Sequence, residues 1–196
     1  MSLRAVVVSL FAFMANGALA AEPPLHDGFK AAIKTVGELR EHFSTIVRDP
    51  EGKAEVARAL PKLSGRLDSL VRAKLAFTET VVNAKWPQDR DKIAAATEVL
   101  KDQLHKSLFA LTDVFAALPP EWQTRGGDLR AKLDWVPHGK WQSLDDVARD
   151  LGAEGTSADQ LRAESDAFVA LVRHLKEIVD GIVTDLASGP AVPSAR

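Results

Sequence analysis

Residues 49–82, DPEGKAEVARALPKLSGRLDSLVRAKLAFTETVV, decide how this chain folds. Asp49 is suited to cap a helix and Pro50 to occupy its first position. Pro61 lies inside the pattern and is predicted to kink or split the helix, whereas Lys74 is expected to snorkel to solvent from the margin of the apolar stripe. Apolar residues recur at helical steps and form one stripe: Val56, Leu60, Leu63, Leu67, Leu70, Phe77 and Val81.

The same spacing predicts three further helices, at about 27–48, 88–118 and 157–186. Asp27 is the expected N-cap of the first, and Ser157 with Gln160 forms a capping-box pattern before the last. Because only a very short turn separates the first two helices, we expect them to be antiparallel neighbours. The three stripes are Phe29, Ile33, Val36, Leu39, Phe43 and Ile46; Ile93, Leu100, Leu104, Leu108, Leu111, Phe115 and Leu118; and Leu161, Phe168, Val172, Leu175, Val179, Ile182 and Leu186.

The connection between the third and fourth long helices, residues 119–156, is too long to be an unstructured loop in a compact domain. GDLRAKLDW, residues 127–135, and SLDDVARDLG, residues 143–152, are each predicted to form a short helix. Strand alternation is absent from the sequence. The pattern therefore predicts an all-α fold, an up-down-up-down four-helix bundle whose long helix 3–4 connection contains short helices.

The first twenty residues have the pattern of a cleaved export signal: Arg4, an apolar run, and small residues that end in Ala20. The apolar run is shorter than the roughly 20 residues that span a bilayer, so we expect cleavage between Ala20 and Ala21 and no transmembrane span in the mature chain. Residues 21–188 are then the helical bundle domain and 189–196 a flexible C-terminal tail. The expected location is periplasmic or secreted.

Composition limits the kinds of partner. The formal net charge is −2 at pH 7, and removal of Arg4 with the signal lowers it to −3, which gives no support to nucleic-acid or anionic-membrane binding. Cysteine is absent, so the fold has no disulfide, thiolate metal site or cysteine nucleophile. Both methionines lie in the signal. We expect no cofactor.

Isolated pairs of candidate metal ligands occur on helix faces, without the matched Glu-x-x-His partners of di-iron bundles. They are Asp102 with His105, His174 with Glu177, and Glu38 with His42, and we interpret all three as solvated surface pairs. A G-x-S-x-G motif is also absent. Glu121 beside Trp122 resembles a carboxyl acid against an aromatic wall, but its position after LPP is better explained by compensation of a helix dipole.

Tryptophan is concentrated in the long connection, where Trp122, Trp135 and Trp141 lie near His138. These four residues are the candidate binding site, because tryptophan is enriched at binding hot spots and irregular segments often carry function. The alternative is that the rings only cover the end of the bundle core.

The favoured function is a non-enzymatic binding or interaction module, with an envelope protein, a glycan or an apolar small molecule as partner. One alternative is a small-ligand carrier or sensor with a pocket inside the bundle, suggested by Thr97 and Ser165, which interrupt apolar stripes. A second is an enzyme that acts on envelope glycan through Glu121.

The pattern of an export signal leads to a testable prediction about the N-terminus of the mature protein. Protein isolated from an export-competent bacterial host should begin Ala-Glu-Pro-Pro, because the small residues before Ala21 fit signal peptidase. N-terminal sequencing measures this directly. Retention of Met1 on membrane-embedded protein would show that the apolar run is an anchor.

Overall fold

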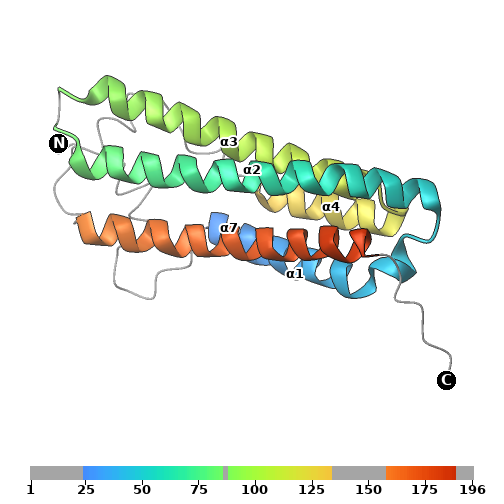
Figure 1. The fold of residues 1–196 in the computed structure, drawn as a ribbon. Helices are drawn as coiled ribbons and strands as arrows, with labels where there is room; N and C mark the ends of the chain where they lie inside the picture. The colour runs from blue at the N-terminus through green and yellow to red at the C-terminus, as the bar shows by residue number, and fades with distance from the viewer. Residues whose placement is uncertain (1–23, 86–87, 134–157, 189–196) are drawn as a thin grey trace.

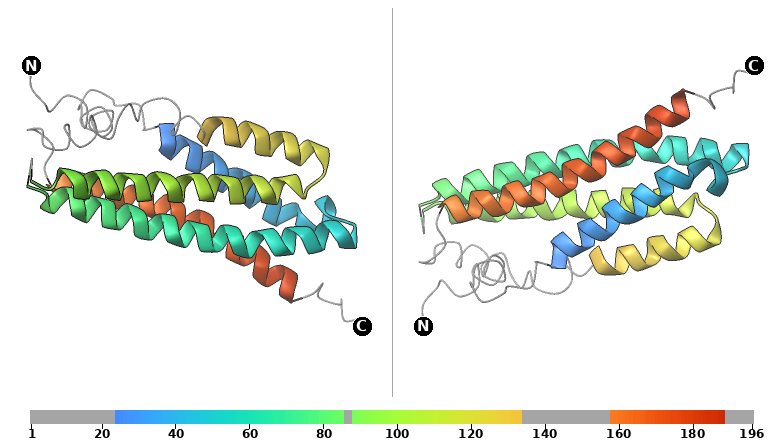
Figure 2. Two further views of the ribbon diagram at one scale, coloured as in Figure 1. Left: turned by 90° about the horizontal axis from the view of Figure 1, so that it is seen from above. Right: turned by 90° about the horizontal axis from the view of Figure 1, so that it is seen from below.

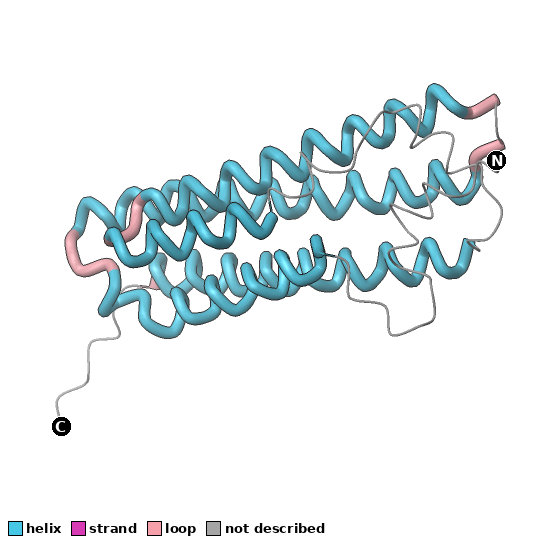
Figure 3. Tube along the Cα trace, turned by 180° about the vertical axis from the view of Figure 1, so that it is seen from behind, coloured by secondary structure: helices cyan, strands magenta, loops and turns pink. Residues whose placement is uncertain are grey.

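A computed structural model describes residues 24–85, 88–133 and 158–188. Its helices are α1 (Pro24–Ile46), α2 (Pro50–Asn83), α3 (Arg90–Ala116), α4 (Pro120–Leu133) and α7 (Ala158–Ala187). Figure 3 shows that the described segments are helical apart from short turns at the ends of the bundle. The all-α prediction is therefore confirmed for these residues.

The helix at residues 50–83 begins as the sequence predicts. Asp49 is its N-cap, and the Asp49 carboxylate accepts a hydrogen bond of 2.6 Å from the Gly52 backbone N–H. Of the two predicted effects of Pro61, a kink or a split, the split does not occur, since α2 continues through it. Pro61 and Ala57, whose carbonyl loses its helical partner, both lie on the exposed face, where solvent is available to that carbonyl.

Two other predicted boundaries differ from the structure. The helix at 24–46 begins before Asp27, which lies in its first turn instead of at the N-cap. The short helix expected from residue 127 begins at Pro120, and the Pro119 carbonyl accepts from the Trp122 and Gln123 backbone N–H groups. The predicted cap at Ser157 lies outside the described residues.

The helices of the described chain form a ring of contacts. α7 packs against α1 and α2, α3 packs against α2 and α4, and α4 returns to α1. The expectation that α1 and α2 are packed neighbours is wrong, because α7 comes between them in the ring of contacts.

Helix direction also differs from the predicted alternation. The colours in Figures 1 and 2 show that α1, α3 and α7 run one way and α2 and α4 the other. The up-down-up-down order of four helices is therefore not confirmed: α4 is an additional member, and α7 runs parallel to its neighbour α1. A ring with an odd number of helices necessarily contains a parallel pair.

The predicted stripes form the core. All seven stripe residues of α2 are buried, as are all seven of the third stripe, from Ile93 to Leu118. In α1, Phe29, Val36 and Leu39 are at most 2% exposed, whereas Ile33, Phe43 and Ile46 pack partly buried at its edge. The fully buried side chains alone represent several tens of kcal/mol of apolar transfer free energy, at about 1.5–3 kcal/mol each.

The close packing of α4 on α3 depends on Gly126. A Cβ atom at this position would overlap the Cβ and ring of Phe115, whereas at the adjacent Gly127 it would meet no atom within 4 Å. Gly126 is buried and Gly127 is exposed. The absent side chain at residue 126 therefore sets the distance between the two helices.

This contrast gives a matched pair of variants. Gly126→Ala should lower the free energy of unfolding by about 1–3 kcal/mol through overpacking against Phe115. Gly127→Ala should instead raise it by up to about 1 kcal/mol through better helix propensity. Urea denaturation followed by circular dichroism measures both, and equal effects of the two substitutions would contradict the predicted contact.

Candidate functional site

The predicted tryptophan site is only partly within the described chain. Trp135, His138 and Trp141 lie outside the described residues, so their role stays a prediction. Trp122 lies in the first turn of α4 and is 7% exposed. The Arg125 guanidinium covers its ring at 4.6 Å from the centroid, and forms a 2.8 Å ion pair with Glu38 on α1. Trp122 therefore belongs to the packed core of the described region.

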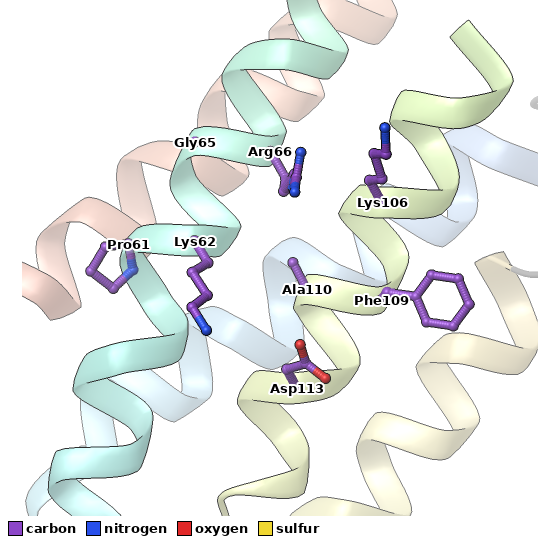
Figure 4. A pocket seen from close by; sticks show the side chains of 8 residues that line it. All are labelled: Pro61, Lys62, Gly65, Arg66, Lys106, Phe109, Ala110 and Asp113. Atoms are coloured by element: carbon purple, nitrogen blue, oxygen red, sulfur yellow. The ribbon is translucent and has the colours of Figure 1, made fainter. Parts of the chain in front are cut away.

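The described surface has a groove between α2 and α3, shown in Figure 4. Its larger hollow has a volume of about 450 Å³, and a second of about 340 Å³ continues it, since Lys62 and Asp113 line both. We call the two together the α2–α3 groove. Its remaining lining residues are Glu55, Arg58, Ala59, Pro61, Gly65, Arg66, Lys106, Phe109, Ala110, Ala116 and Ala117.

Small residues let the two backbones approach beneath the groove. The Ser107 hydroxyl on α3 donates to the Arg66 carbonyl on α2 at 3.2 Å, so the helices are in near-direct contact there. Gly65 has open space where a Cβ would stand, and Ala110 fills little of the hollow. The groove consequently has a shallow, apolar floor and long side chains on its rims.

Positive charge dominates the rims. Arg58, Lys62 and Arg66 line the groove from α2, and Figure 4 shows Arg66 between α2 and α3 and Lys62 extending along α2. Neither Lys62 nor Arg66 forms an ion pair with a carboxylate of the described chain, whereas Lys106 on α3 contacts Asp102 at 2.6 Å. The protein carries a net charge of −2, so this groove has the opposite sign to the molecule as a whole.

An exposed aromatic residue flanks the groove. Phe109 leaves α3 on the side away from α2 and is 59% exposed (Figure 4). Its ring lies 5.7 Å from the Arg130 guanidinium of α4. Helical periodicity does not single out Phe109, because this residue does not lie on the apolar stripe of α3. The sequence signal for such a position is a large apolar residue that lies off the stripe and among charged side chains.

A second polar cluster lies inside the bundle, where α1 begins. The Lys74 Nζ atom on α2 is 2.8 Å from the Glu164 carboxylate on α7, and the His26 Nε2 atom on α1 is 3.6 Å from its other oxygen. The three side chains are between 7% and 12% exposed. The prediction that Lys74 snorkels to solvent is therefore wrong: Lys74 points inward because Glu164 supplies a buried counter-ion.

Aromatic rings complete the surroundings of this charge. The Lys74 ammonium lies 5.8 Å and 5.7 Å from the ring centroids of Phe77 and Phe168, and His26 stacks on Phe168. Burial raises the pKa of the Glu164 carboxyl, but His26 and Lys74 outweigh it, so the pKa lies below its ordinary value. The cluster links α1, α2 and α7, and its three titratable side chains are almost fully covered.

The polar residues that suggested an internal pocket bond to the protein itself. The Thr78 hydroxyl donates to Ser165 at 2.9 Å across the α2–α7 contact, and the Thr97 hydroxyl donates to the Ile93 carbonyl at 2.8 Å. These bonds explain why the apolar stripes are interrupted. The interrupted stripes therefore no longer point to a small-ligand carrier with a pocket inside the bundle.

The remaining chemical candidates are found on the surface. His174 and Glu177 are 58% and 76% exposed, and the Glu121 carboxylate, also 76% exposed, lies 3.5 Å from Arg125. Glu121 lines neither hollow of the α2–α3 groove. Within residues 24–85, 88–133 and 158–188, there is no group of three or more His, Asp or Glu residues placed to hold a metal ion.

Comparison with known proteins gives no relative. No protein-family model, curated protein or solved structure matches this chain. A function for this protein must therefore be inferred from the geometry of its own residues.

The buried ion pair predicts that removing one of its partners destabilises the fold far more than replacing both. Glu164→Gln should lower the free energy of unfolding by about 3–5 kcal/mol, because it leaves the Lys74 ammonium buried without its counter-ion. The double variant Lys74→Met/Glu164→Leu should regain most of that loss. Glu79→Gln is the control, since Glu79 and Arg162 join the same two helices at 3.3 Å on the exposed surface, where a pair contributes less than about 1 kcal/mol.

The same site predicts the response to acid. Because folding lowers the pKa of Glu164, its ionised form stabilises the fold above the ordinary carboxyl value, and this contribution is lost as pH falls through the lowered pKa. The free energy of unfolding of the wild type should therefore fall more steeply below about pH 5 than that of the double variant, which has no carboxyl at residue 164. Urea melts at a series of pH values measure this, and parallel acid slopes would contradict the assignment.

Proposed function

We propose that this protein is exported to the periplasm or secreted and acts there as a non-enzymatic interaction module. The signal pattern of residues 1–20 supports export. None of the helices in the described part of the chain is long and apolar enough to cross a membrane. The helical bundle then serves as a rigid scaffold that presents a binding surface.

The observation that carries this proposal is the α2–α3 groove. It combines an apolar floor, the cations Lys62 and Arg66 without a counter-ion in the described chain, and the exposed ring of Phe109 on a protein of net negative charge. Hot spots in protein interfaces typically combine arginine and aromatic residues. The titratable groups of the interior, Lys74 and Glu164, are by contrast bonded to each other and buried.

The connection at residues 119–156, called here the tryptophan connection, belongs to the same proposal as a second recognition element. Trp135, His138 and Trp141 are its candidate binding residues, while Trp122 anchors α4 beneath Arg125. Among an envelope protein, a glycan and an apolar small molecule, the charge of the groove favours the protein, because a neutral glycan would gain little from its cationic rims.

Site-specific photocrosslinking in the bacterial periplasm tests this function. A photoreactive residue at Phe109 should give an adduct of one defined mass, because Phe109 is exposed beside the groove. The same residue at Arg173, exposed on α7, should give none and is the matched control.

A third position, Trp141, reports whether the connection contacts the same partner. Adducts of equal mass from positions 109 and 141 would show one interface, and different masses would show two. Absence of a specific adduct from both positions would refute the interaction module.

A further inference from the structure

We propose that the α2–α3 groove binds an acidic amphipathic helix of a partner protein; this inference rests on the proposed interaction function and names its partner. From Glu55 to Arg66, the α2 rim of the groove spans eleven residue steps. At 1.5 Å per residue this is about 16 Å, or three helical turns. The groove therefore matches a short helical segment in length.

The floor of the groove suits close approach by a helix. Ala59, Gly65 and Ala110 leave room along its length, and Ala116 and Ala117 continue this surface toward the end of α3. Helix axes lie 8–10 Å apart when they pack, at a distance set by the side chains at the contact. A helix with small apolar residues on one face would become a third member of the α2–α3 layer.

The rims select the charge of the occupant. Four cations, Arg58, Lys62, Arg66 and Lys106, face two carboxylates, Glu55 and Asp113. Glutamate or aspartate on both flanks of the bound helix would pair with Lys62 and Arg66, which have no counter-ion in the described chain. A basic helix would instead meet four like charges.

The charges also set the direction of the bound helix. Arg66 and Lys106 occupy one end of the groove, while Glu55 lies at the other. The C-terminus of a helix carries partial negative charge and is stabilised by nearby cations. The occupant should therefore end near Arg66 and run parallel to α2.

Other anionic partners fit less well. A phospholipid surface or a nucleic acid extends past the groove and would meet the net negative charge of the rest of the molecule, whereas a helix of three turns lies between the cationic rims. A single bound helix of three turns buries less area than a standard protein interface, so binding should be transient, with a dissociation constant in the micromolar range, and should weaken with salt.

Selection from a displayed library of helical 18-residue peptides tests the inference on the full mature chain. Selected peptides should be enriched in Glu and Asp beside an apolar face. Lys62→Glu/Arg66→Glu should weaken them at least tenfold, and Phe109→Ser should also weaken them. Lys34→Glu/Arg173→Glu is the matched control, because it makes the same charge change at exposed positions on α1 and α7, and it should leave binding unchanged.

Spin labels on α2 measure the direction in which the bound peptide helix lies. The chain has no cysteine, so Ala54→Cys and Ser69→Cys each give one labelling site, at the two ends of the α2 rim. A nitroxide at position 69 should broaden NMR resonances at the C-terminus of an isotopically labelled selected peptide, and one at position 54 those at its N-terminus. The reverse pattern would overturn the proposed orientation.

The inference would be overturned if the selected peptides were basic or uncharged, or if acidic peptides bound Lys62→Glu/Arg66→Glu as well as the wild type. Stronger groove-dependent binding to phosphatidylglycerol vesicles than to peptides would also overturn it. If selected peptides lose affinity in Trp135→Ala and Trp141→Ala but not in the groove variants, the interaction function stands and its site is the tryptophan connection. If no peptide is selected and no periplasmic adduct forms, both proposals fail.

Discussion

The ion pair between Lys74 and Glu164 constrains how the helices fit together. Apolar side chains tolerate small shifts of one helix along another, but a buried ammonium group separated from its carboxylate carries a penalty of several kcal/mol. The contact therefore fixes the rotation and register of α2 against α7, and His26 extends it to the beginning of α1. In this arrangement α1 packs against α7, and α3 and α4 close the ring.

Sequence periodicity predicted where the helices lie and which faces they bury, because a helix repeats its environment every three to four residues. It did not predict which helices are neighbours. The short turn at Asp49 implied that α1 and α2 pack together, but periodicity carries no information about a third helix inserted from far along the chain. Lys74 shows the same limit of periodicity. Its position on the apolar stripe could be read from the sequence, but its counter-ion could not be identified, because Glu164 lies 90 residues away.

The candidate site was predicted less well than the fold. Tryptophan content drew attention to the long connection, yet Trp122 is a packed residue beneath Arg125. The groove is lined by residues common on any helix surface, and only the juxtaposition of α2 and α3 gathers Lys62, Arg66 and Lys106 around a shallow apolar floor. A composition signal marks single unusual residues, whereas a binding surface is a property of several ordinary ones placed together by tertiary structure.

The insertion of α7 between α1 and α2 has a consequence for biosynthesis. α7 is the last of the described helices to be made, so the side chains of α1 and α2 that it covers have no permanent neighbour until nearly the whole chain has been translated. Contacts between segments so distant in sequence form late, because closure of the intervening loop costs entropy. On the proposed export route, this order of assembly would keep the nascent chain loosely structured while it is threaded through a narrow translocation pore, and would delay completion of the core until its C-terminal part has crossed.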